Sequence, residues 1–248
     1  MLRFEDIVFG PIHSRRLGSS LGVNLLPAHG KLCNFDCVYC ECGWNKDGVD
    51  DRRLPSFDEI EAAMRTVFPV AGQVDSITFS GNGEPTLHPD FPAVIDLTLR
   101  LRDEFLPEAK VSVLSNATML SRESVCNALM KIDNPILKLD APYTEAMRSI
   151  NRPNGTYRVA DVVDNLKKFD GNFILQTIFF KNAEVNLITS DFLNDWYSVV
   201  RELHPREIMV YTIDRETPMK NLGKYSLEEM RIFVEPLIRE GFNVKISG

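Results

Sequence analysis

The 248-residue sequence lacks several features that would each assign it to a particular class of proteins. It has no excess of basic residues, because 28 lysines and arginines against 35 aspartates and glutamates give a net charge of −7. This balance leaves a nucleic-acid partner possible but does not favour it. No apolar run approaches the roughly 18 residues of a membrane span. The first residues, MLRFEDIVFGPIHSRR, also lack the apolar stretch of a signal peptide. We therefore expect a cytoplasmic protein that does not bind a membrane.

Cysteine is scarce as well, with five in the whole chain. Cys42 and Cys126 do not suggest a disulfide framework, which favours a reducing compartment. No repeat, low-complexity tract or Gly/Ser-rich linker divides the chain. With 44% hydrophobic and 25% charged residues, the composition is that of an ordinary globular protein. We predict one domain over residues 1–248, with an N-terminal segment at 1–19 and the main body at 20–248.

From residue 20 onward, apolar runs of strand length alternate with amphipathic helical patterns. The strands are predicted at residues 20–26, 74–80, 110–115, 136–140, 173–180, 207–213 and, as a short last strand, 242–246. The helices are predicted at residues 57–68, opened by Ser56 as N-cap, and at 91–105, 121–132, 158–169, 191–203 and 227–239. This alternation indicates parallel βαβ units. A complete eight-stranded barrel needs about 250 residues, and here the second strand begins only at residue 74. The pattern therefore predicts a partial, open parallel βα barrel of six to seven strands, with a flavodoxin-like doubly wound sheet as the alternative.

Three cysteines stand close together in the segment CNFDCVYC: Cys33, Cys37 and Cys40. Three thiolates can hold three corners of a four-iron cluster and leave the fourth iron open to another ligand. A zinc site would need a fourth ligand at suitable spacing, and Cys42 follows Cys40 too closely. Chance clustering is the other alternative. The spacing favours an iron–sulfur site with an open position.

With Tyr39 directly before the third cysteine, CNFDCVYC resembles the motif of the radical S-adenosylmethionine (radical SAM) superfamily. The resemblance implies a [4Fe–4S] cluster on Cys33, Cys37 and Cys40, whose open iron binds the methionine end of S-adenosylmethionine. Reduction by an electron donor of the flavodoxin or ferredoxin class then cleaves this cofactor to a 5′-deoxyadenosyl radical, which abstracts hydrogen from the substrate. The family also implies the partial barrel. Tyr39 is expected to shield the cluster or the adenine, although loop packing would explain it too.

Polar residues follow several predicted strands, at the ends where parallel barrels place their active sites. After the second strand, SGNGEPT resembles the family's Gly-Gly-Glu motif, which contacts the amino group of the cofactor. We expect Glu84 to contact the amino group and Gly83 to take the backbone role of the motif. Asn82 stands where the first glycine usually is, and we expect its side chain to make an extra contact with the cofactor. An ordinary turn is the alternative, because Gly, Asn and Pro are common turn residues.

The resemblance also assigns Ser115 and Asn116, after the third strand, to the carboxylate or ribose of the cofactor, with a helix or turn cap as the alternative. Asp140 is expected to bind the ribose or the substrate, or else to form a turn before Pro142. Thr212 belongs to the strand whose apolar residues could flank the adenine, and we include it among the cofactor contacts.

Candidates on the substrate side are polar residues near the barrel mouth: Asp140, Gln176, Arg215, Arg15 and Arg16. Gln176 and Thr177 lie in an otherwise apolar strand, and the alternation does not say which of them faces a ligand. Arg215 could bind an anionic substrate through its guanidinium group or form a salt bridge with Asp214 or Glu216. The paired arginines could bind phosphate or carboxylate or form a solvated turn.

The segments GPIHSRRLG, SLGVNLLP, CVYCECG and DRETP together resemble a subgroup related to wyosine-type, tRNA-modifying and MoaA-like radical SAM proteins. No second cysteine set precedes Cys33 or follows the predicted barrel, so we expect a single cluster. The substrate stays open among a small molecule, a nucleotide and a peptide. A non-catalytic iron–sulfur protein for electron transfer or redox sensing is the alternative function, and a zinc-binding interaction domain is a third.

Overall fold

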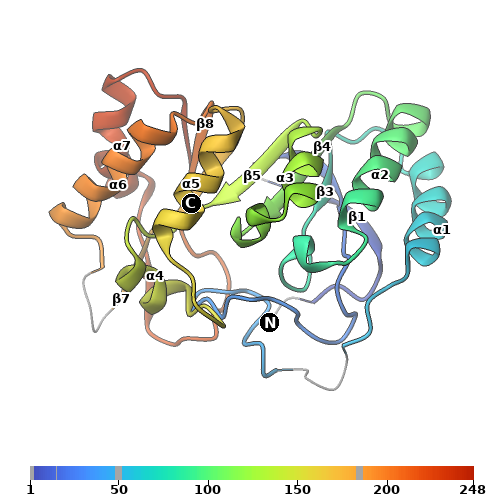
Figure 1. The fold of residues 1–248 in the computed structure, drawn as a ribbon, viewed down its shortest axis with the longest axis horizontal. Coiled ribbons are helices and arrows are strands. Elements are labelled where there is room, and N and C mark those ends of the chain that lie inside the picture. The colour runs from blue at the N-terminus through green and yellow to red at the C-terminus, as the bar shows by residue number, and fades with distance from the viewer. Residues whose placement is uncertain (1–2, 15, 48–51, 183–186) are drawn as a thin grey trace.

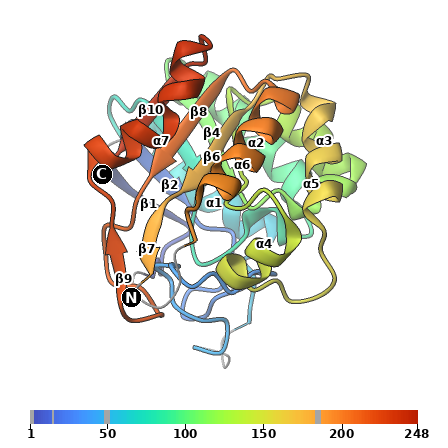
Figure 2. The same ribbon diagram turned by 90° about the vertical axis from the view of Figure 1, so that its left-hand side faces the viewer.

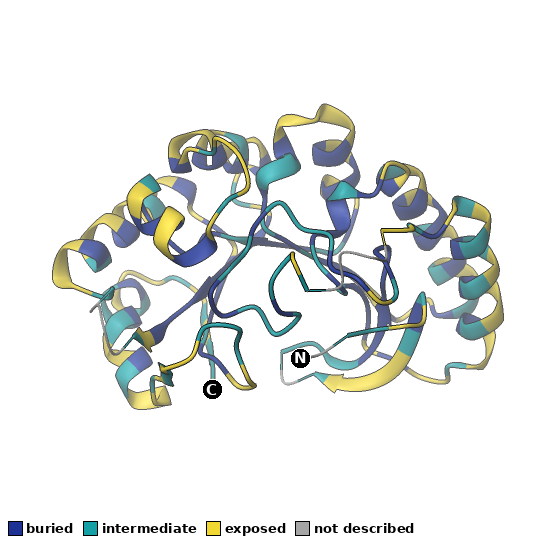
Figure 3. Cartoon of the chain, turned by 90° about the horizontal axis from the view of Figure 1, so that it is seen from below, coloured by how far each residue is buried: buried dark blue, intermediate teal, exposed yellow. Residues whose placement is uncertain are grey.

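Eight strands form one curved sheet in the described part of the chain, and helices cover its convex face (Figure 1; Figure 3). The structure is a computed structural model that describes residues 3–14, 16–47, 52–182 and 187–248. The strands of the sheet are, in spatial order, β1 (Val8–Ser14), β2 (Gly18–Val23), β3 (Ser76–Phe79), β4 (Lys110–Ser115), β5 (Asn134–Lys138), β6 (Ile174–Ile178), β8 (Glu207–Tyr211) and β10 (Val244–Ser247).

The helices follow the strands along the chain as βα units. They are α1 (Phe57–Val67), α2 (Phe91–Phe105), α3 (Glu123–Met130), α4 (Thr144–Asn151), α5 (Val159–Leu166), α6 (Ser190–Leu203) and α7 (Leu227–Arg239). Short 3-10 turns lie at Phe68–Val70, Pro85–Leu87, Thr118–Ser121 and Lys167–Phe169. Within the described ranges, no helix is both long and apolar enough to cross a membrane.

The pairing of the strands confirms the predicted partial parallel barrel. From β2 to β10 every neighbouring pair is parallel, so seven strands run in one direction. Their order never reverses, whereas a doubly wound sheet reverses its strand order and carries helices on both faces. The flavodoxin-like alternative is therefore wrong.

Strand β1 was not predicted, and it adds an antiparallel edge to the sheet. It pairs with β2 from Val8 opposite Val23 to Ser14 opposite Gly18, with a register shift between Phe9 and Ile12. Most of β1 is exposed, so its sequence does not show the apolar alternation of a half-buried strand. The antiparallel pair of β7 (Phe180–Asn182) and β9 (Leu222–Lys224), which are far apart in the sequence, was missed as well. It forms a separate two-stranded sheet, which Figure 2 shows at the same end of the molecule as the N-terminus.

Alternation along the strands separates two environments. Side chains on the convex face pack under the helices, as where Phe79 meets Phe91 of α2 at 6.3 Å between ring centroids. On β6 the Thr177 hydroxyl faces the helices and accepts a hydrogen bond from Trp196 Nε1 at 3.2 Å. Burial of such large aromatic side chains contributes about 1.5–3 kcal/mol each to the free energy of folding. The concave face carries a smaller apolar cluster and most of the polar residues discussed below.

Local sequence sets the helix starts where capping is strong. Ser56 Oγ accepts a hydrogen bond from Glu59 N at 3.3 Å, and the Glu59 carboxylate accepts one from Ser56 N at 2.8 Å. This capping box confirms Ser56 as the N-cap of α1. Ile60 and Met64, one helical turn apart, are fully buried against the sheet.

Candidate cluster and cofactor site

The cysteine loop (residues 32–40) lies at the carboxyl edge of the sheet, in the connection from β2 to α1. On one side Leu32 pairs with Gly83 in an isolated bridge, so the loop rests on the turn after β3. On the other side Val38 N donates to Ile150 O at 3.0 Å, so the end of α4 supports it. The loop is therefore fixed between two βα connections.

Gly83 is required by this close approach. Its φ is +137°, and a Cβ there would lie 1.9 Å from the carbonyl oxygen of Leu32. A side chain at Gly83 would push the cysteine loop away from the turn. The glycine that the sequence analysis assigned to a backbone role thus positions the loop.

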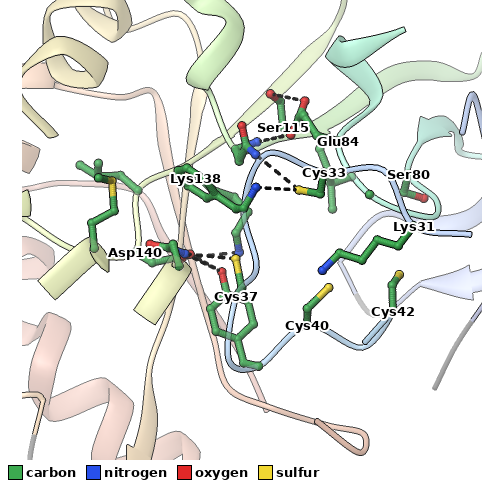
Figure 4. A pocket seen from close by; sticks show the side chains of 18 of the residues that line it. Lys31, Cys33, Cys37, Cys40, Cys42, Ser80, Glu84, Ser115, Lys138 and Asp140 are labelled. Carbon is green, nitrogen blue, oxygen red and sulfur yellow. Dashed lines mark hydrogen bonds and ion pairs between the residues drawn. The ribbon is translucent and has the colours of Figure 1, made fainter. Parts of the chain in front are cut away.

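Cys33, Cys37 and Cys40 line one cavity of about 210 Å³ (Figure 4). Amide donors reach two of the sulfurs: Asn116 Nδ2 lies 3.7 Å from Cys33 Sγ, and Asn151 Nδ2 lies 3.4 Å from Cys37 Sγ. Within the described residues, no group of three or more His, Cys, Asp or Glu side chains is arranged to hold a single metal ion.

A buried cation accompanies the thiols. The Lys31 side chain is 1% exposed, and its Nζ donates to Gly43 O at 2.7 Å and lies 3.4 Å from Asp36 Oδ1. Burial lowers the pKa of Lys31, but the nearby cysteines and Asp36 outweigh burial, so the pKa is raised. Figure 4 shows its side chain pointing toward Cys40. The positive charge of Lys31 favours the thiolate form of the neighbouring cysteines over the neutral thiol.

The thiols respond to this setting in different ways. Burial raises the pKa of Cys33, and burial together with Cys40 raises the pKa of Cys37 to about 11. The hydrogen bond from Cys42, aided by Lys31, lowers the pKa of Cys40 to about 6 despite burial. Cys42 Sγ lies 3.4 Å from Gly81 O. Three thiols on one cavity, with amide donors and a lysine beside them, fit a cluster that is held by cysteine sulfur.

Glu84 is the acidic residue of the turn after β3, and it is 2% exposed. Its Oε1 accepts hydrogen bonds from Thr86 N, Thr86 Oγ1 and Ser115 Oγ at 3.1, 2.5 and 2.8 Å, and its Oε2 accepts one from Asn116 N at 2.7 Å. Burial raises the pKa of Glu84, although these hydrogen bonds oppose that shift. Among the described residues, no lysine or arginine forms an ion pair with Glu84. A carboxylate oxygen can accept more than one hydrogen bond, so Oε2 is able to accept another from a ligand.

A second polar network lies across the cavity. Asp140, 4% exposed, accepts hydrogen bonds from the Tyr39 hydroxyl and, at 2.7 Å, from Asn151 Nδ2. Lys138 Nζ lies 3.5 Å from Asp140 Oδ1 and donates to the Tyr211 hydroxyl. Burial lowers the pKa of Lys138, but the charge of Asp140 outweighs it and raises the pKa. The network buries a carboxylate and an ammonium as a pair.

Two predicted cofactor contacts lie away from this cavity's lining. The side chain of Asn82 faces the N-terminal segment, where Nδ2 donates to Phe4 O and Pro27 O, each at 2.8 Å, and Oδ1 accepts from Phe4 N at 3.0 Å. Thr212 lines a neighbouring hollow, and its Oγ1 accepts a hydrogen bond from Tyr225 N at 3.2 Å. The remaining predicted contacts, Tyr39, Gly83, Glu84, Ser115, Asn116 and Asp140, line the cavity with the three cysteines.

The substrate-side candidates divide between the two spaces. Gln176, Arg215 and Arg16 line the second hollow, of about 370 Å³, whereas Asp140 lines the cysteine cavity. Arg215 Nη1 lies 2.6 Å from Glu41 Oε2, so it has an acidic partner on the cysteine side. Arg15 lies outside the described residues. The strand alternation that the sequence left open is thereby settled, because Gln176 faces the hollow.

Sequence analysis missed Lys31, Lys138, Asn34 and Asn151. Asn34 stands inside the cysteine motif, and its Oδ1 accepts from Asn116 Nδ2 at 2.7 Å, so the motif itself contained a signal for it. Asn151 ends α4, a helix that was not predicted, so only the fold brings its amide to Cys37 and Asp140.

Comparisons with known proteins identify the family of this chain. A family model described as the Radical SAM superfamily matches residues 28–183. The UPF0026 protein MJ1312 of Methanocaldococcus jannaschii is 31% identical over 235 residues, which span 90% of this chain and 68% of that protein. A Brachyspira hyodysenteriae protein named GTPase Obg is 28% identical over 90% of this chain and 32% of its own length.

Among solved structures, Streptococcus suis SuiB bound to S-adenosylmethionine shares the fold, with a TM-score of 0.67 and 18% identity. The match covers 88% of this chain and 49% of SuiB. The chain thus spans about a third to two thirds of the lengths of these relatives. The family match shows a radical SAM enzyme with a [4Fe–4S] cluster and S-adenosylmethionine as cofactors, so the predicted class of enzyme is confirmed. The chain belongs to the radical SAM superfamily.

Proposed function

We propose that this enzyme uses one [4Fe–4S] cluster, on Cys33, Cys37 and Cys40, to remove hydrogen from a substrate in the neighbouring hollow. The observation that carries the proposal is that the three cysteines and Glu84 line one cavity at the carboxyl edge of the sheet. When bound, the cluster and S-adenosylmethionine supply reductive cleavage of the sulfonium and hydrogen abstraction. The protein binds them and excludes side reactions.

Glu84 is suited to the amino group of the cofactor. It is a buried carboxylate without a partner cation in the described part of the chain, and an ammonium group at Oε2 would offset the unfavourable burial of its charge. Ser115 and Asn116 donate hydrogen bonds to the Glu84 carboxylate and border the same cavity. We assign the carboxylate or ribose of the cofactor to these two residues, and the ribose or the substrate to Asp140.

The remaining predictions concern partners and place. We infer an electron donor of the flavodoxin or ferredoxin class, a cytoplasmic location, and one functional domain over residues 1–248. Kinship with wyosine-type and MoaA-like proteins rests on the segments GPIHSRRLG and DRETP together with the cysteine motif. It does not identify the substrate, which is a small molecule, a nucleotide or a peptide.

Anaerobic reconstitution with iron and sulfide tests the proposal. Addition of dithionite and S-adenosylmethionine should yield 5′-deoxyadenosine and methionine. The Cys37→Ser variant should lose the iron–sulfur absorbance, whereas Cys126→Ala, a change in the buried face of α3, should retain it. A fully loaded cluster that produces no 5′-deoxyadenosine would contradict the proposal, and so would bound zinc without acid-labile sulfide.

A further inference from the structure

The second hollow is a built space next to the cluster cavity. Side chains from all eight strands of the sheet and from the turn between β1 and β2 contribute to its walls. It shares Cys42, Ser80, Gly81 and Leu114 with the cysteine cavity, so a molecule in the hollow reaches the reactive site from the side.

Two buried donors in this hollow lack a hydrogen-bond partner among the residues that the structure describes. In the described part of the chain, four buried side-chain polar atoms lack a hydrogen bond, and the two that are donors are Arg16 Nη1 and Gln176 Nε2. Both residues line the hollow, and Gln176 is 2% exposed. Buried donors are nearly always satisfied, so these two indicate the place of a ligand's acceptor atoms.

The two donors lie close enough to serve one small ligand. Gln176 stands opposite Met209 in the β6–β8 register, and the Arg16 guanidinium lies over Tyr211, 4.8 Å from the ring centroid. Tyr211 is two residues beyond Met209 on the same face of β8, which is about 7 Å along the strand. A ligand of a few bonds can therefore meet both.

The charges in the hollow favour a negative ligand at Arg16. Both acidic side chains of the lining have cationic partners: Glu41 pairs with Arg215 at 2.6 Å, and Asp214 pairs with Lys224 at 3.2 Å. No carboxylate among the described residues pairs with Arg16. Arginine binds carboxylate and phosphate through paired N–H donors.

An apolar strip crosses the lining, between polar side chains that include His13, Ser20 and Thr78. Leu17 and Leu114 pack with Ile136 and Met209 along the floor of the hollow. Leu114 also borders the cluster cavity, so the apolar floor leads from the cationic end to the reactive end. The hollow thus has a cationic end at Arg16 and an apolar strip between that end and the cluster cavity.

We propose that the substrate is a small organic anion, with its carboxylate or phosphate on Arg16, an acceptor on Gln176, and its apolar body directed along Leu114 toward the cluster. This inference rests on the proposed function, because it names the substrate class of the same site. Arg16 would bind a carboxylate and a phosphate through the same N–H donors, and the experiment distinguishes these two groups.

Isothermal titration of the reconstituted full chain with S-adenosylmethionine present tests the inference. The probes are benzoate, phenyl phosphate, neutral benzamide and cationic benzylamine. One anion should bind at millimolar concentration, at least about 10-fold more tightly than benzamide, and the better anion identifies the group. Arg16→Gln should weaken that binding about 10- to 100-fold, and Gln176→Met should weaken it less, since it removes an uncharged donor. Arg239→Gln, an exposed change on α7, is the control.

Equal or tighter binding of benzamide or benzylamine would overturn the inference, and so would anion binding that survives Arg16→Gln. Arg16→Lys, which keeps the charge, should restore part of the affinity and thereby separates loss of charge from misfolding. Cluster absorbance and 5′-deoxyadenosine formation of the wild-type protein are recorded on the same preparation. Cofactor cleavage without anion binding overturns only the substrate class, whereas a missing cluster or missing cleavage overturns the proposed function.

Discussion

At the carboxyl edge of the sheet, the acidic residues Glu84 and Asp140 are buried and border one cavity, whereas at the amino edge Asp133 is partly exposed and joins neighbouring strands. Glu84 and Asp140 are 2% and 4% exposed. At the other edge the side chain of Asp133 is 27% exposed, and that of its partner Lys110 is 63% exposed. The same residue types therefore stand in different dielectric surroundings.

The hydrogen bonds differ in the same way. Asp133 accepts from Val111 N at 2.9 Å and from Arg102 Nη1 at 3.0 Å, so its charge is fully matched by the protein. Glu84 accepts only neutral donors and has no cation in the described part of the chain. Asp133 at the amino edge thus has its cation within the protein, whereas Glu84 at the carboxyl edge meets only neutral donors, which supports our proposal that Glu84 binds a ligand.

The largest effect is expected from neutralising Glu84. Glu84→Gln keeps the shape but removes the charge, so affinity for S-adenosylmethionine should fall about 10- to 100-fold, as for loss of a charge-assisted hydrogen bond. Equilibrium dialysis on the reconstituted protein measures this. Glu108→Gln, an exposed change before β4, is the control. Loss of the cluster in Glu84→Gln would mean that the turn supports the cysteine loop rather than the cofactor.

A smaller effect is expected from Asn151, which donates to Cys37 Sγ and to Asp140. Asn151→Leu removes a hydrogen bond to Cys37, a proposed cluster ligand, and such bonds raise the reduction potential. The potential should therefore become more negative in a redox titration followed by electron paramagnetic resonance. The free energy of unfolding should fall by about 1–3 kcal/mol, because Asp140 loses a buried donor.

An asparagine at the amino edge of the sheet provides the control for Asn151→Leu. Asn134 lies at the amino edge, where its Nδ2 donates to Ser112 Oγ at 3.1 Å. Asn134→Leu should reduce stability and leave the cluster potential unchanged. An equal shift of potential in both variants would show that general loosening of the fold, and not the bond to Cys37, sets the potential.

Much of the scaffold could be predicted because its periodic patterns are strong. The bounds of α2, β4 and α7 agree with the predicted residues 91–105, 110–115 and 227–239. Strand β1 and helix α4 escaped prediction for different reasons. β1 is largely exposed, and α4 (TEAMRSIN) is short and mostly polar, whereas the equally short α3 and α5 carry more apolar residues.

Site residues that belong to a sequence motif could be predicted. Site residues that come together only through the fold could not. The cysteines, Glu84 and Asn116 follow one another along strand ends, so topology alone brings them together. The contact of Arg16 with Tyr211 joins the first hairpin to β8, the strand of the sixth βα unit, and no local pattern encodes it. For Asn82, the motif indicated a cofactor contact, but the structure shows its side chain bound to the N-terminal backbone. The role assigned to Asn82 stays a prediction.

The smallest effect is expected at the amino edge and depends on pH. Partial burial raises the pKa of Asp133, but the hydrogen bonds from Val111 N and Arg102 outweigh it, so the pKa lies below its ordinary value. A carboxyl whose folded pKa is depressed stabilises the protein above its unfolded pKa, and this contribution is lost as pH falls through the folded pKa. Asp133→Asn should therefore lower the free energy of unfolding by about 1–2 kcal/mol at neutral pH and by progressively less in acid.

Asp103→Asn is the control, because it removes a more exposed partner of Arg102 and should change the free energy of unfolding by less than about 0.5 kcal/mol. Urea unfolding at several pH values measures both, and a cost for Asp133→Asn that does not shrink in acid would show that packing, not charge, holds this edge together.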